Sequence, residues 1–137
     1  MKKMNLYFGL IMFVIFLLTG YYLEIYFKPE HLDNLTLRME IRANHIYILF
    51  ISFLNILAYK CNFTEIKKKV IYLEISFRIL LITSGVMALY AFIYDHNGDL
   101  TGRNVTLTAV ILSLLAVVIF LANELIHHTL KKQYESN

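Results

Sequence analysis

The residues of this chain most able to take part in chemistry are ionisable side chains inside apolar stretches. Glu74 and Arg78 are four residues apart, so a helix places them on one face with the acid toward the N-terminus, the favourable order for an ion pair. An ionisable group at the centre of a bilayer costs about 2.5–3.5 kcal/mol on insertion scales, so each one needs a partner or a function. The pair either neutralises itself inside a helix bundle or forms part of a charged path.

Three further polar residues fall at a similar depth in neighbouring apolar stretches, namely Asn55, Asn123 and Glu124. We therefore predict one polar cluster made of Asn55, Glu74, Arg78, Asn123 and Glu124. Two carboxylates would then share one guanidinium, and a third group or a variable proton must balance them. This arrangement makes one acid a candidate for proton-coupled transport.

A second set of polar side chains flanks the apolar stretches at their opposite ends. This outer cluster consists of Glu24, Arg38, Glu40, Arg42, His45, His96 and Arg103. One interpretation is a solvated rim that caps helices and anchors them at the headgroups. The other is a vestibule in which Arg38, Arg42 and Arg103 bind a small anion.

Metal, cofactor and nucleophilic chemistry find little support in the sequence. Glu124 and His127 form a Glu-x-x-His pair, the spacing that di-metal sites in helical bundles use, but one such pair arises readily by chance. We therefore predict no metal and no cofactor, because every histidine lies at the edge of an apolar stretch and none at mid-span, where haem ligands are expected. The sequence also lacks Gly-x-Ser-x-Gly, His-Glu-x-x-His and Walker glycine motifs, which disfavours an enzyme.

Four apolar stretches must position these residues: 6–27, 41–59, 70–94 and 105–126. Each is long enough to cross a hydrocarbon core of about 30 Å as a helix. Of the 137 residues 58% are hydrophobic and 17% charged, whereas a soluble domain has about 25% charged residues. Because the backbone in lipid must satisfy its own hydrogen bonds, we predict an all-α membrane protein, with residues 1–137 forming one up-down-up-down bundle of four helices.

The distribution of basic residues predicts the orientation of this bundle. One side carries Lys2, Lys3, Lys60, Lys67, Lys68, Lys69, Lys131 and Lys132, and the other carries Lys28, Arg38, Arg42 and Arg103. The more basic side is expected to face the cytoplasm, which places both termini there and predicts a bacterial inner membrane. The formal net charge of +3 is too small to indicate a nucleic-acid partner, and the single cysteine, Cys61, excludes an intrachain disulfide.

Three classes of function follow from these features. The first is an oligomeric transporter or channel that uses the inner cluster as its path. The second is a non-catalytic accessory or interaction subunit of a membrane complex, in which ionisable residues only determine helix register. The third is a membrane enzyme that uses the outer cluster. Four helices are too few to enclose both a wide pore and several polar groups, so we predict a homo-oligomer, with Gly85, Ala88, Ala109 and Ala116 as candidates for close contacts.

Overall fold

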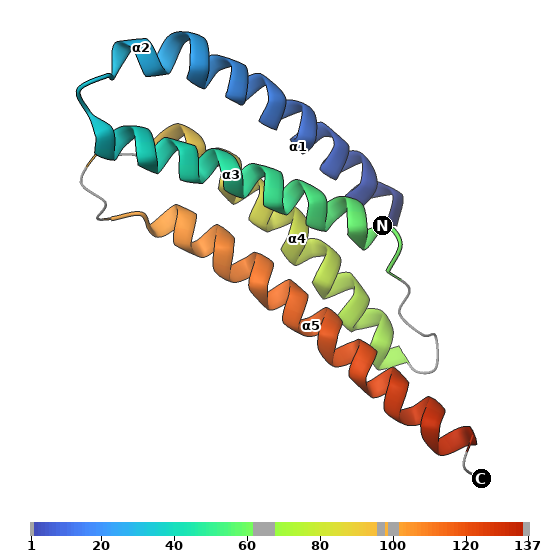
Figure 1. Ribbon diagram of the computed structural model, residues 1–137. Coiled ribbons are helices and arrows are strands. Elements are labelled where there is room, and N and C mark those ends of the chain that lie inside the picture. The colour runs from blue at the N-terminus through green and yellow to red at the C-terminus, as the bar shows by residue number, and fades with distance from the viewer. Residues whose placement is uncertain (1, 62–67, 96–97, 99–101, 136–137) are drawn as a thin grey trace.

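The computed structural model describes the backbone of residues 2–61, 68–95, 98 and 102–135, and the side chains of 3–61, 72–95, 98 and 102–125. The described residues form α1 (Lys2–Tyr22), η1 (Leu23–Phe27), α2 (Lys28–Glu30), α3 (Leu35–Ala58), α4 (Lys68–Tyr94) and α5 (Asn104–Glu135). The first three elements make one long helix, so four helices of alternating direction fill Figure 1. No strand occurs in the described ranges, and the predicted all-α fold class is confirmed.

All four helices are long and apolar enough to cross a membrane, over Lys3–Glu30, Leu35–Ala58, Tyr72–Tyr94 and Asn104–Leu125. The four predicted spans are confirmed as helices of this length and apolar character. The second span begins earlier than its apolar stretch because Asn34 caps α3, accepting a hydrogen bond from the Leu37 amide at 3.0 Å.

The helices pack in the order in which they occur along the chain. α1 lies along α3, α3 packs on α4, and α4 packs along α5, so α3 and α4 are the central helices, with α1 and α5 on either side of them in Figure 1. Two glycines permit close approach: a Cβ at Gly9 would lie 2.9 Å from the Ser52 carbonyl oxygen on α3, and one at Gly85 would lie 2.6 Å from the Phe8 ring on α1.

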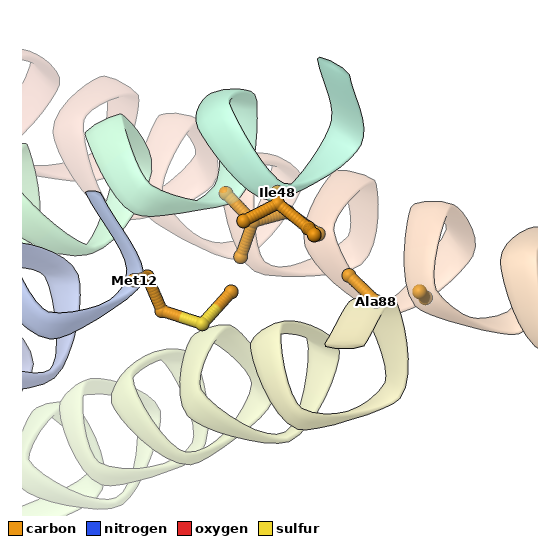
Figure 2. Packing of buried hydrophobic residues seen from close by; sticks show 5 residues of the cluster. Met12, Ile48 and Ala88 are labelled. Carbon is orange, nitrogen blue, oxygen red and sulfur yellow. The ribbon is translucent and has the colours of Figure 1, made fainter. Parts of the chain in front are cut away.

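The described apolar core has three clusters: one near the middle of the bundle, one toward the end that holds the N-terminus, and one where Leu23 and Phe27 meet Ile41 of α3. Met12, Ile48 and Ala88 meet from α1, α3 and α4 (Figure 2), and Ala109 of α5 completes this contact with a small side chain. Ala116 belongs to the second cluster. The small residues that the sequence marks as candidates for close contacts are thus buried within this chain, where they serve the packing of α4 with α1, α3 and α5.

Two ends of the bundle matter for the site. The terminal end holds the beginning of α1, the end of α3 and the beginning of α4, together with the C-terminal part of α5. The loop end, on the opposite side, holds residues 31–34, the end of α4 and the beginning of α5.

Candidate functional site

The terminal end contains a fully buried arginine, Arg78 of α4, that bonds to groups on two sides. Its Nε donates to Glu74 Oε1 at 2.9 Å, and Nη2 lies 2.9 Å from the same oxygen. Its Nη1 donates to the Ala58 carbonyl at 2.9 Å and its Nη2 to the Cys61 carbonyl at 3.1 Å. Carbonyls at a helix C-terminus have no partner within the helix and carry partial negative charge, so the guanidinium ties α4 to the end of α3.

Asn55 of α3 extends this network across three helices. Its Nδ2 donates to the carbonyls of Ile51 at 3.0 Å and of Leu81, on α4, at 3.1 Å. Its Oδ1 accepts from Asn5 Nδ2 of α1 at 2.9 Å, and the same Nδ2 is 3.3 Å from the Arg78 carbonyl. Both asparagines are fully buried. The side chains of Asn5 and Asn55 therefore set α1, α3 and α4 in one relative register.

Asn5 is a member of this network that the sequence reasoning missed, because it lies just before the first apolar stretch. A signal was present: Asn5, Gly9 and Met12 recur at helical spacing, and all three are buried. The neighbouring turn of the same interface is held by Ser52, whose hydroxyl donates to the Gly9 carbonyl at 2.9 Å.

The structure brings Asn55, Glu74 and Arg78 together but does not add Glu124 to them. Asn123 is buried on α5, whereas Glu124 is exposed on the surface of that helix. Adjacent residues of a helix are about 100° apart, and here this rotation turns Glu124 to the surface while Asn123 faces the interior. Of the two carboxylates expected to share the guanidinium, Glu74 is paired with Arg78, and the sharing by Glu124 stays a prediction.

A second buried network lies at the loop end, centred on Asn44 of α3. Asn44 Nδ2 donates to the carbonyls of Ala91 at 3.0 Å and Asp95 at 3.2 Å, both at the end of α4. Its Oδ1 accepts from the Arg103 guanidinium and lies 3.0 Å from Thr106 Oγ1. One asparagine thus connects α3 with the end of α4 and the beginning of α5.

Two acids complete this loop-end network. Asp95 Oδ2 accepts from the Thr106 amide at 2.7 Å and from its hydroxyl at 2.6 Å, so a carboxylate satisfies a free amide in the first turn of α5. Glu40 is fully buried, and its Oε2 accepts from the Gly98 amide at 2.7 Å. Gly98 has a φ of +82°, a conformation that favours glycine.

The other members of the predicted outer cluster form two groups: Glu24 lies within electrostatic range of Arg38 and Arg42, and Arg103 lies with the loop-end network. Glu24 pairs with Lys28 on the surface of its own helix, and Arg42 is exposed. Arg38 donates to the Leu32 carbonyl at 3.3 Å, while Arg103 turns toward Asn44 and the Glu40 carbonyl. Of the three arginines of the predicted anion vestibule, Arg38 and Arg103 thus bond to different groups, and Arg42 is exposed.

Of the three histidines in the predicted sites, the structure describes the side chain of His45. His45 Nδ1 lies 3.0 Å from Thr19 Oγ1, and its ring stacks on Phe16 with centroids 4.1 Å apart. His45 therefore contributes to the contact between α1 and α3. His96, and the side chain of His127 in the Glu-x-x-His pair, lie outside the described residues. Among the described residues, no group of three or more His, Cys, Asp or Glu side chains is arranged to hold a metal ion.

Comparison with known proteins does not identify a function for this chain, so its function is inferred from the geometry of the two networks. No family model, no curated protein and no solved structure matches the chain. The arrangement itself consists of two buried networks, one at each end of the bundle, whose donors and acceptors come from different helices. What they do chemically is to bond helices to one another.

Proposed function

We propose that this chain is a non-catalytic interaction subunit of a membrane complex, whose buried polar groups hold its four helices in register. The observation that carries this proposal is the engagement of Arg78, which is fully buried and bonds to Glu74, the Ala58 carbonyl and the Cys61 carbonyl. A side chain that moves an ion or a proton must exchange partners during its cycle. The partners of Arg78 are groups of the protein's own framework: one side chain of α4 and two backbone carbonyls at and just beyond the end of α3.

The loop-end network supports the same function. Asn44, Asp95 and Thr106 bond to one another and to backbone groups, as a structural connection between α3, α4 and α5 requires. In membranes an interhelical hydrogen bond contributes about 0.6 kcal/mol on average and up to about 1.7 kcal/mol. A network at each end therefore adds both stability and a defined rotation for each helix.

The outward faces of the described spans fit apolar surroundings, whether lipid or the helices of a partner. Ile79, Val86 and Ile93 are exposed on α4, and Leu107, Ile111, Leu114 and Val118 are exposed on α5. An oligomeric transporter or channel would need polar groups facing a lumen between copies. Glu124 is an exposed carboxylate on α5 that such a lumen could use, so it belongs in the test.

The orientation with both termini in the cytoplasm of a bacterial inner membrane is part of this proposal. It is supported by the eight lysines on the terminal side against four basic residues on the other. A C-terminal fusion to alkaline phosphatase, which is active only outside the cytoplasm, should be inactive. An active fusion would reverse the assignment.

The transport alternative is tested by flux measurements in liposomes. The purified chain should conduct protons and common ions no faster than protein-free vesicles. If wild-type protein conducts, and Glu74→Gln or Glu124→Gln abolishes the flux while circular dichroism shows a folded protein, transport replaces the interaction role.

The interaction role itself predicts a partner in native membranes. Extracted from them in a mild detergent, the 16.1 kDa chain should migrate in a complex heavier than any oligomer of the purified chain. Equal masses for the extracted and the purified protein would contradict this role and leave a homo-oligomer or a monomer. The Arg78→Met variant should lose the complex as its helices lose register.

A further inference from the structure

An apolar groove of about 230 Å³ lies between α3, α4 and α5 toward the terminal end. Leu54 and Leu57 of α3, Phe77 of α4 and Val117 of α5 line it, and Cys61 lies at one end. The lining residues Leu57 and Leu121 are 59% and 54% exposed, so the groove opens at the surface of the bundle. Apart from Cys61, the lining belongs to the membrane-spanning segments.

The chemistry of this groove restricts what can fill it. Apolar cavities of about 150 Å³ stay dry and bind small apolar molecules, because a water molecule needs two to four polar partners. The lining side chains here are hydrocarbon apart from one thiol. An opening within the spans faces the hydrocarbon core of a bilayer, which offers acyl chains in excess.

We propose that the groove binds one acyl chain of a membrane phospholipid. A methylene that moves from the bilayer into the groove stays in an apolar medium, so the gain is contact with the groove wall and removal of a void rather than a hydrophobic effect. The end of the groove at Cys61 lies just past Ala58, where the span of α3 ends, and therefore at the level of the headgroups. The exposed residue Lys60 there provides a cation for the phosphate.

Cys61 is a built-in probe of this site, because it is the single cysteine among 137 residues and it lines the groove. Its thiol lies 3.5 Å from the Leu57 carbonyl, and burial raises the pKa of the Cys61 thiol. Labelling by a maleimide, which reacts with the thiolate, is therefore done at alkaline pH. A bound acyl chain should shield the thiol.

The first experiment uses the unmodified protein. Wild-type chain is stripped of phospholipid in a steroid-based detergent, whose rigid rings do not mimic an acyl chain, and Cys61 labelling is timed before and after adding phosphatidylglycerol. With lipid at ten times its dissociation constant, the labelling rate should fall about tenfold, since about one site in eleven remains empty. A rate that does not respond to lipid overturns the proposal.

The second experiment uses neighbouring valines as a matched pair. Val117 lines the groove, whereas Val118 is 60% exposed on the outer face of α5. Native mass spectrometry should show a phospholipid retained by wild type and by Val118→Phe, and lost from Val117→Phe, whose ring fills the groove. Equal retention by all three proteins, or none by wild type, overturns the proposal. If Val117→Phe does not fold, the wild-type labelling experiment alone decides.

Discussion

Replacing Arg78 by methionine tests whether the terminal-end network is held by backbone carbonyls or by the ion pair. Methionine retains a long, flexible side chain that fills the same space, so the change removes mainly polar contacts. The variant loses the hydrogen bonds to the Ala58 and Cys61 carbonyls and leaves Glu74 without its cation. We expect this loss to be the largest of any single substitution in the network.

The magnitude follows from these contacts. Interhelical hydrogen bonds in membranes contribute about 0.6–1.7 kcal/mol each, so the two carbonyl bonds contribute about 1–3 kcal/mol. Removing one partner of a fully buried pair costs about 3–5 kcal/mol. Glu74 keeps 24% of its side chain exposed, which reduces the cost of leaving this carboxylate unpaired to about 1–2 kcal/mol. Together, Arg78→Met should lower the free energy of unfolding by about 3 kcal/mol.

Glu74→Gln is the comparison that separates the two contributions. The amide oxygen still accepts from the Arg78 Nε, and the guanidinium keeps the two carbonyls at the end of α3, whose partial negative charge favours a cation. The expected loss is about 1 kcal/mol. In the double variant the acid is no longer left unpaired, so its loss should be about 1 kcal/mol smaller than that of Arg78→Met alone.

The assay is reversible unfolding in mixed micelles, followed by far-ultraviolet circular dichroism, for wild type, both single variants and the double variant. If Glu74→Gln destabilises the protein as much as Arg78→Met, the ion pair dominates and the reasoning from the carbonyls is refuted. A loss below about 1 kcal/mol for Arg78→Met would show that the network contributes little to stability.

Three further substitutions test the helix contacts by the same unfolding measurement. Asn55→Leu removes the bonds between α3 and both α1 and α4, and should cost about 1–3 kcal/mol; a neutral effect would mean that apolar packing replaces them. Gly9→Ala places a Cβ 2.9 Å from the Ser52 carbonyl oxygen and should cost about 1–3 kcal/mol of unfolding free energy by separating α1 from α3. Unchanged stability would show that the two helices shift freely. Glu124→Gln, on the exposed face of α5, should stay within about 0.5 kcal/mol of wild type, and a larger loss would indicate a buried partner for this acid.

The sequence was sufficient for the parts of the site that depend on local geometry. Glu74 and Arg78 are one helical turn apart, so their pairing follows from the helix alone. Asn55, a polar residue inside an apolar span, had to face the interior because lipid offers it no partner. Its partner Asn5 could not be assigned, since 50 residues separate the two in the chain.

The sequence by itself determined four helices long and apolar enough to span a membrane, because the length and apolar character of a stretch suffice to predict a span. Only the tertiary structure decided which face of each helix is buried, placing Asn123 inside and Glu124 outside and joining Glu40 to Gly98 across 58 residues. The physical reason is that lipid and protein core are equally apolar. Hydrophobic periodicity therefore does not distinguish the two faces, and interhelical hydrogen bonds and close contacts at small residues select between them.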